Sequence, residues 1–575
     1  MTGQIAARVQ LSLAGALGGF LLWATVEAAE RGRIGDYAAL VLTGLVLTGF
    51  GGLMAMAGPL GLRPALTRAL GLGAVAAGLV WLTALRYDDA AAFLANPMQA
   101  LAGFVVAALP VPFLVAARRS RWNDYAALFR EAWSIALRLV AALAFVALVW
   151  LAVFLSDQVL RIVGITVIDR VINLGPVALV LSGAALGLGM AVIHDMTDAA
   201  SPQLVLRILR LFLPVVLAVM AVFLAALPMR GLDGLTGGLS PVLLLLTMVA
   251  AGISLVSIVV DQSDAEAVQS VFLRRAAMVM ALVLPVFAGL ALWAIWLRTA
   301  QHGWTPERLF ITLVAGVGLA YGLVYALAVL RGAGWMERIR QGNIRVILGV
   351  LVLAALWMTP ILNAEAISAG DQLRRYEDGR LPVAALDLRA LRSWGQPGAA
   401  ALTRLQALAE QPGHEALADL LAGVDIAPPP DPLDLATQLA ALMPVQPATA
   451  TGTRDTLLQA TDGYLLQDWL TLCSLPPDDG SPACLMLVAD LIPARPGEEA
   501  ILLLRRGPDY VEVAGLFLND RGFAEYRLAS RPDGQAITAD EAARMLRSFG
   551  AAPPPVTPAL LNQLGTGESG LILVP

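Results

Sequence analysis

The residue types that most often carry chemistry are few in this chain and lie far apart. The three histidines are His194, His302 and His414, and none has a second histidine or a cysteine at the spacing of a metal site. The sequence also lacks a phosphate-binding G-x-x-x-x-G-K-[ST] loop, an H-E-x-x-H zinc motif and a G-x-S-x-G nucleophile motif. We therefore predict no metal site and no cofactor, and we assign no catalytic residue.

Four charged residues interrupt an otherwise apolar stretch. They are Asp157, Arg161, Asp169 and Arg170, all within residues 157–173. Placing such residues at the centre of a bilayer costs about 2.5–3.5 kcal/mol each on insertion scales. We expect 157–173 to form an interfacial or re-entrant helix. Arg308 falls on the same predicted side of the membrane as these four residues. If the protein has a membrane-embedded polar site, we expect it among these five side chains.

The two cysteines, Cys473 and Cys484, flank the turn-forming segment SLPPDDGSPA. Proline, aspartate and glycine in that segment favour a chain reversal that brings the two ends together. The distribution of arginines places this part of the protein outside the cytoplasm, where disulfides persist, so we predict a Cys473–Cys484 disulfide. Two free thiols, one of them buried, are the alternative if this part lies inside.

Composition indicates the elements that must position these residues. The chain is 58% hydrophobic and 14% charged, against about 25% charged residues in ordinary soluble domains. Repeated apolar runs long enough to cross a bilayer indicate a polytopic membrane protein. We predict eleven spans, at residues 9–27, 37–57, 65–85, 97–117, 135–155, 174–194, 211–229, 240–260, 276–297, 309–330 and 344–362.

Orientation follows from the arginines, since the chain has no lysine. With eleven spans, sixteen arginines fall on the side of the N-terminus and eight on the other. The positive-inside rule then places the N-terminus in the cytoplasm and everything after residue 362 outside it. One span more or fewer would reverse the location of the C-terminal part.

The last third of the chain reads as water-soluble. Residues 363–423 are predicted to be helical, 424–454 to be a Pro-rich linker, and 455–575 to be a small α+β domain with an antiparallel sheet. Residues 363–575 hold 15 Arg against 27 Asp and Glu. This acidic balance argues against nucleic acid as a partner.

Glycine recurs inside the predicted spans, and the predicted span interiors hold almost no ionisable residues. Small residues let membrane helices approach closely, which we favour over a ligand loop. Few buried charges weaken the case for an ion-coupled transporter, but a carrier of lipid-like molecules needs none. The glycine clusters are Gly15, Gly18 and Gly19; Gly49, Gly51 and Gly52; and Gly183, Gly187 and Gly189.

Two segments near the last spans resemble a known family. RTAQHGWTPERL (298–309) and ISAGDQLRRYEDGRL (367–381) are similar to bacterial membrane proteins grouped as domain of unknown function 4153, with the resemblance strongest over 290–410. It implies a bacterial inner-membrane protein, and no activity, substrate or cofactor. Its motif positions are Gly303, Trp304, Thr305, Arg308, Ser368, Gln372 and Arg375.

These motif residues also have a purely structural interpretation. Thr305 before Pro306 is a good helix N-cap, because its hydroxyl can accept a hydrogen bond from a free backbone N–H. Arg308 can anchor the span at the membrane interface. On this view the motif residues form a joint between helices and not a catalytic site.

The sequence therefore predicts an α-helical polytopic membrane bundle of about eleven spans with a C-terminal soluble α+β domain. Its expected partner is the lipid bilayer. We favour a non-enzymatic envelope protein for transport, sensing or scaffolding. A deep cavity lined by the glycine-rich faces would favour a carrier of lipid-like molecules, and charged side chains converging on one pocket would favour an enzyme.

Overall fold

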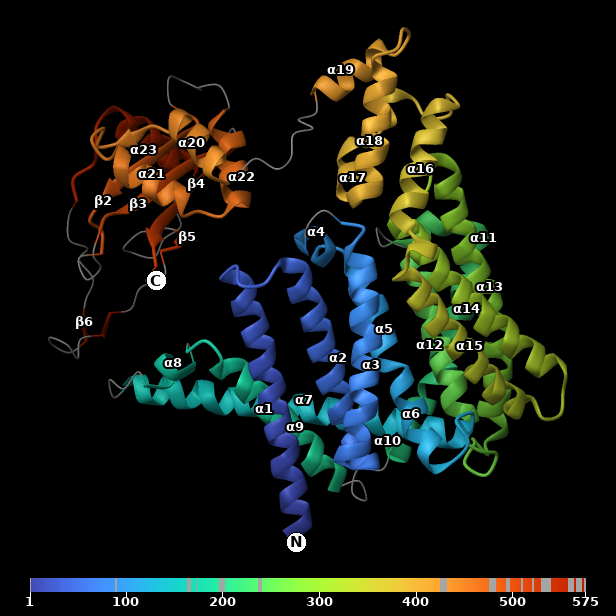
Figure 1. The fold of residues 1–575 in the computed structure, drawn as a ribbon. Helices are drawn as coiled ribbons and strands as arrows, with labels where there is room; N and C mark the ends of the chain where they lie inside the picture. The colour runs from blue at the N-terminus through green and yellow to red at the C-terminus, as the bar shows by residue number, and fades with distance from the viewer. Residues whose placement is uncertain are drawn as a thin grey trace. The chain divides into compact units, whose positions relative to one another are not determined.

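The computed structural model divides the chain into two compact units, Met1–Val424 and Asp425–Pro575 (Figure 1). It describes residues 2–87, 90–162, 167–172, 174–195, 202–235, 240–423, 432–474, 482–492, 497–507, 510–519, 522–528, 539–556, 563–564 and 571–572. Each unit is described by itself below.

The first unit is entirely helical in its described residues. Its helices are α1 (Thr2–Glu30), α2 (Asp36–Leu60), α3 (Leu62–Ala84), α4 (Ala90–Leu94), α5 (Pro97–Ala108), α6 (Pro110–Arg119), α7 (Tyr125–Ile162), α8 (Val167–Ile172), α9 (Val177–Asp195), α10 (Pro202–Arg210), α11 (Phe212–Leu235), α12 (Pro241–Val260), α13 (Val271–His302), α14 (Pro306–Leu330), α15 (Trp335–Trp357), α16 (Ala364–Glu377), α17 (Leu388–Ser393), α18 (Gly395–Ala409) and α19 (Glu415–Gly423), with short 3₁₀ turns at Pro360–Leu362 and Val383–Ala385.

Ten of the described helices are long and apolar enough to cross a membrane. A shorter apolar helix, Val177–Ile193, matches the predicted span 174–194. The predicted fold class is therefore confirmed: a bundle of about eleven apolar helices followed by a small sheet-containing domain. One apolar core joins α11 to α15 around Met280, Leu284 and Phe287, and another joins α2, α3 and α6 around Met56 and Val115.

The predicted interfacial helix over 157–173 is wrong as a single element. Helix α7 continues to Ile162, so Asp157 and Arg161 belong to its last turns, and only the six-residue α8 follows. Residues 125–162 contain neither glycine nor proline, so nothing in them ends the helix. Arg161 Nε donates to Asp157 Oδ2 at 2.7 Å, one helical turn away, and this ion pair offsets both charges.

Residues 363–423 form helices as predicted, but they belong to the same compact unit as the apolar helices. The reason is close packing of the start of α18 against the end of α3. The Gln396 N–H donates to the Arg86 carbonyl at 2.9 Å. Gly395 has φ +60°, and a Cβ there would lie 2.4 Å from the same carbonyl oxygen.

The second unit is a small sheet covered by helices on both faces. Its elements are α20 (Pro432–Leu442), β1 (Val445–Gln446), α21 (Thr451–Gln459), α22 (Gly463–Cys473), β2 (Cys484–Ala489), β3 (Glu499–Gly507), β4 (Tyr510–Leu518), β5 (Ala524–Leu528), α23 (Ala539–Ala551), and the separate pair β6 (Gln563–Leu564) and β7 (Leu571–Ile572). The sheet order is β1-β2-β3-β4-β5, with β1 parallel to β2 and the other pairs antiparallel.

Alternation along the strands builds the two cores of this unit. Met486 and Leu502 pack with Trp469 of α22 on one face, whereas Leu485 and Leu503 pack with Leu546 of α23 on the other. Successive side chains of a strand point to opposite faces, which is why neighbouring residues enter different cores.

The predicted linker over 424–454 needs correction. Helix α20 and strand β1 lie within it, and Leu435, Leu439 and Val445 are buried in the core of the second unit. The prolines flank the segment PLDLATQLAAL, whose apolar residues recur at helical spacing. Strand β1 also makes the sheet mixed, where an antiparallel sheet was expected.

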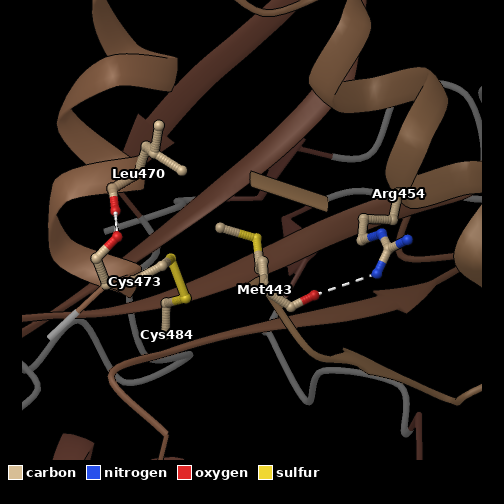
Figure 2. The surroundings of a disulfide bond; sticks show 6 residues. Met443, Arg454, Leu470, Cys473 and Cys484 are labelled. Carbon is tan, nitrogen blue, oxygen red and sulfur yellow. Dashed lines mark hydrogen bonds between the residues drawn. A yellow bond between two sulfur atoms is a disulfide. The ribbon is translucent and has the colours of Figure 1, made fainter. Parts of the chain in front are cut away.

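A disulfide joins the end of α22 to the start of β2 (Figure 2). It connects Cys473 to Cys484 with the two Cα atoms 5.2 Å apart, and both residues are buried in the core shared by α20, α22 and the sheet. Nearby, Arg454 donates to the Met443 carbonyl at 3.2 Å. The predicted pair of cysteines is thus bonded in the structure.

Candidate functional site

The two motif segments meet at the turn between α13 and α14. Gly303 ends α13 with φ +79°, and a Cβ there would lie 2.6 Å from Nε2 of Gln372 on α16. That amide donates to the carbonyl oxygens of His302 (3.1 Å) and Trp304 (3.2 Å). Residues almost seventy positions apart in the sequence therefore form one joint.

Arg375 and Asp371 of α16 complete this joint. Arg375 donates to the carbonyls of Thr299 (2.9 Å) and Ala300 (3.2 Å) in the last turn of α13, where helix carbonyls need partners from outside the helix. The Thr299 carbonyl also accepts from the Gly303 N–H at 2.9 Å. Asp371 Oδ2 accepts from the Trp304 N–H at 2.9 Å and from Arg375 Nε at 3.1 Å. Sequence reasoning missed Asp371, although its position four residues before Arg375 was a signal for an ion pair.

The start of α14 is capped from within the motif. The Thr305 hydroxyl accepts from the Arg308 N–H at 3.3 Å, and Arg308 Nη1 donates to the Gly303 carbonyl at 2.7 Å. Ser368 is fully buried on the inner face of α16. The geometry matches the structural interpretation of these residues as a helix joint.

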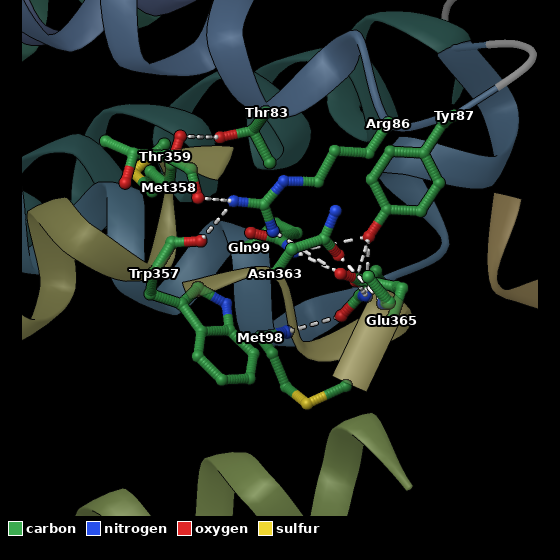
Figure 3. Close-up of polar contacts among 12 residues, drawn as sticks. Thr83, Arg86, Tyr87, Met98, Gln99, Trp357, Met358, Thr359, Asn363 and Glu365 are labelled. Atoms are coloured by element: carbon green, nitrogen blue, oxygen red, sulfur yellow. Dashed lines mark hydrogen bonds and ion pairs between the residues drawn. The ribbon is translucent and has the colours of Figure 1, made fainter. Parts of the chain in front are cut away.

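A buried ion pair lies where α3, α15 and α16 end or begin (Figure 3). Arg86 Nη1 is 3.3 Å from Glu365 Oε2, and the two side chains are 4% and 1% exposed. Arg86 Nη2 also donates to the carbonyls of Trp357 (2.8 Å) and Thr359. The sequence did not predict this pair, because a charged residue next to the end of a predicted span is usually interpreted as an anchor at the membrane interface.

Polar side chains from α5 and from the segments before and after α4 surround the Glu365 carboxylate. Tyr87 donates to Oε1 at 2.6 Å, and Gln99 Nε2 donates to the same oxygen at 3.3 Å. The Asn96 amide donates to the Tyr87 oxygen at 3.0 Å. Burial lowers the pKa of Arg86, partly offset by Glu365, while burial and the nearby Glu365 carboxylate both raise the pKa of Tyr87.

A polar pocket of about 610 Å³ opens beside this ion pair. Thr305 and Arg308 of the motif line it, together with Glu365 and with Arg298 from the last turns of α13. Its remaining lining comes from α4, α5, α12, α13, α14 and α17 and the residues next to them. They are Ala92, Ala95, Asn96, Pro97, Met98, Ser240, Val242, Ile295, Pro306, Glu307, Ile311, Ala390, Ser393 and Trp394.

An apolar cavity of about 490 Å³ lies between α2, α3, α5, α6, α7 and α9. Gly51 and Gly52 of the predicted glycine clusters form part of its wall, together with Gly44 and Gly103, which were not in those clusters. Among the described lining residues, Thr48 is the one with a polar side chain other than methionine sulfur. The rest are alanines and large apolar residues, among them Leu47, Val80, Phe104, Val111, Ile135, Leu139 and Leu186.

Comparison with known proteins decides the family. The model of the family described as "Domain of unknown function (DUF4153)" matches residues 39–405, more than half of the chain. The chain belongs to the DUF4153 family. The match includes the joint, the buried ion pair and the polar pocket, and it ends before the second unit. No curated protein and no solved structure matches the chain.

The other polar residues singled out in this DUF4153 protein do not gather at the pocket. Asp157 and Arg161 pair with each other, Arg170 is exposed on α8, and none of the three lines the polar pocket. The side chain of Asp169 lies outside the described residues. Of the members of this group whose side chains are described, only Arg308 lines the pocket.

The described residues of this DUF4153 chain hold no group of three or more His, Cys, Asp or Glu side chains that could bind a metal. His414 bonds through Nδ1 to the Tyr376 hydroxyl at 2.7 Å, and His302 Nδ1 contacts the Arg298 carbonyl at 3.3 Å. The side chain of His194 lies outside the described residues.

Proposed function

We propose that this DUF4153 protein is a non-enzymatic protein of the bacterial inner membrane that binds a lipid-like, weakly polar molecule in the apolar cavity. The observation that carries the proposal is the glycine-lined wall of that cavity. Its volume of about 490 Å³ falls within the usual range for small-molecule sites, roughly 300–1,000 Å³.

Gly51 borders open space in the wall of this cavity. A Cβ added at Gly51 would meet no heavy atom within 4 Å, and Gly51 is itself exposed, so the cavity has an opening at α2. An apolar wall offers no hydrogen bonds to water, whereas hydrocarbon can fill it without leaving polar groups unpaired. Occupancy by an acyl or isoprenoid chain is the chemistry that fits.

The orientation that we propose follows from the arginine distribution, with the N-terminus in the cytoplasm and the second unit on the extracytoplasmic side. The Cys473–Cys484 bond supports it, because structural disulfides persist outside the reducing cytoplasm.

The polar pocket is the feature that would favour an enzyme instead. Three hydroxyls line it, those of Ser240, Thr305 and Ser393. The Ser393 hydroxyl donates to the Ala390 carbonyl at 2.8 Å, and the Thr305 hydroxyl caps α14. Among the described residues, none of the three hydroxyls is bonded to a basic side chain that could activate it as a nucleophile. The contacts favour binding over covalent catalysis.

Filling the cavity tests the proposal. Gly51→Phe places a ring into the open space, and Gly71→Phe on α3 is a matched control, since Gly71 is also exposed, also meets nothing within 4 Å and does not line the cavity. Native mass spectrometry of the full-length protein extracted from membranes measures the bound molecule. We expect wild type and Gly71→Phe to retain a lipid-like ligand and Gly51→Phe to lose it. Equal retention by both variants, or no ligand in wild type, would contradict the proposal.

A further inference from the structure

We infer that the polar pocket binds an anionic group, a phosphate or a carboxylate, through Arg298 and Arg308. This goes beyond the proposed function, because the polar pocket and the apolar cavity share no lining residue. The two sites can therefore be occupied, and disrupted, independently.

Two guanidinium groups from different helices face the same pocket. Arg298 comes from the last turns of α13 and Arg308 from the first turn of α14. Across the described residues, neither takes part in an ion pair. Bringing like charges together is unfavourable unless an opposite charge lies between them.

The joint holds Arg308 in this position. Its Nη1 atom donates to the Gly303 carbonyl at 2.7 Å, and Gly303 is itself packed against Gln372 and Asp371. A guanidinium has five N–H donors, so one bond to a carbonyl leaves the other donors for a ligand. The motif joint thus fixes one cationic wall of the pocket.

The carboxylates of the pocket do not cancel the arginine pair. Glu365 is already paired with Arg86 and accepts from Tyr87 and Gln99. Glu307 is exposed and lies beyond ion-pair distance of both arginines. It weakens the positive potential without occupying the donors.

Guanidinium groups bind phosphate and carboxylate oxygens through paired N–H donors. The pocket, at about 610 Å³, is larger than one phosphate, so it has room for an organic portion beside Ser393 and Trp394. The same anionic group could belong to a lipid headgroup or to a soluble metabolite. The chemistry of recognition is shared, and the experiment separates the two sources.

The test uses the full-length protein in nanodiscs of phosphatidylcholine, with two probes applied separately. One probe is inorganic phosphate, compared with chloride at equal ionic strength. The other is phosphatidylglycerol mixed into the nanodisc. Binding is followed as the shift in thermal unfolding temperature with probe concentration, for wild type, Arg298→Gln, Arg298→Lys, Glu307→Gln and the control Arg374→Gln, whose side chain is exposed on α16 and outside the pocket.

We expect Arg298→Gln to weaken binding roughly 10–100-fold, the ratio expected for loss of one charge-assisted hydrogen bond. Arg298→Lys should restore part of it, Glu307→Gln should strengthen it, and Arg374→Gln should match wild type. Dependence on Arg298 with inorganic phosphate indicates a soluble anion, and dependence with phosphatidylglycerol alone indicates a headgroup. No shift with either probe, or equal shifts in Arg298→Gln and wild type, would overturn the inference.

Discussion

Gly15 of α1 and Gly183 of α9 lie in backbone contact. A Cβ on Gly15 would stand 1.9 Å from the Gly183 carbonyl oxygen, and a Cβ on Gly183 would stand 2.1 Å from that of Gly15. Gly19 and Gly187 make similar approaches one turn along each helix, to Leu179 and Leu11. The crossing of α1 and α9 therefore depends on residues without side chains, as small-residue packing in membranes requires.

Replacing Gly183 by alanine should destabilise the helical unit, because its methyl group forces α1 and α9 apart. Overpacking of this kind costs about 1–3 kcal/mol. Thermal unfolding of the purified protein in detergent measures the effect. Gly316→Ala on α14 is the control: a Cβ there meets nothing within 4 Å, so stability should stay the same or rise. A Gly183→Ala variant as stable as wild type would disprove the close crossing.

The Gly303 joint predicts a difference between two glycines with the same backbone strain. Gly303 (φ +79°, ψ 178°) and Gly61 (φ +79°, ψ 160°) both disfavour a side chain, but only Gly303 has Gln372 where the Cβ would go. Gly303→Ala should lower the unfolding temperature more than Gly61→Ala does. Backbone strain of this kind costs about 1–3 kcal/mol in each case, so the excess reports the packing of Gln372. Equal losses would mean that the joint contributes nothing beyond strain.

Neutralising Glu365 should be among the most damaging single changes in the helical unit. Glu365→Gln leaves Arg86 buried without its counter-charge, which costs about 3–5 kcal/mol. Removing both charges together, in Arg86→Met with Glu365→Leu, should cost less than the sum of the single changes. Thermal unfolding of the four proteins of this double-mutant cycle measures the coupling. Additive losses would show that the pair is not coupled, and Glu307→Gln serves as an exposed-carboxylate control.

Cys473 and Cys484 connect the structure to the proposed orientation. Protein taken from intact cells and denatured should react with a thiol reagent only after reduction, because disulfides persist outside the reducing cytoplasm, where we propose that the second unit lies. Closing a loop of this size should stabilise the second unit by roughly 3 kcal/mol in the chain-entropy model. Cys473→Ser should lower the unfolding temperature of that unit accordingly. Full labelling without reductant would argue that the second unit faces the cytoplasm.

Sequence pattern was sufficient to predict those features that depend only on residues close together in the chain. Apolar runs of span length identified the helices that the structure contains, and Thr305 before Pro306 identified the cap of α14. Sequence pattern gave a wrong prediction where charged residues or prolines were taken to interrupt a helix. The charges at 157–161 did not interrupt α7, because they pair with each other, and the prolines at 424–454 did not prevent α20 from forming.

The sequence by itself determined the membrane class, the glycine-based packing and the presence of two motif segments, since each depends on composition or on spacing along one helix. Only the tertiary structure decided what those residues meet. Gln372 and Arg375 reach the end of α13 because α16 packs beside it. Glu365 pairs with Arg86, which lies nearly three hundred residues earlier in the chain. Such contacts depend on how helices pack together, and no local period or propensity encodes them.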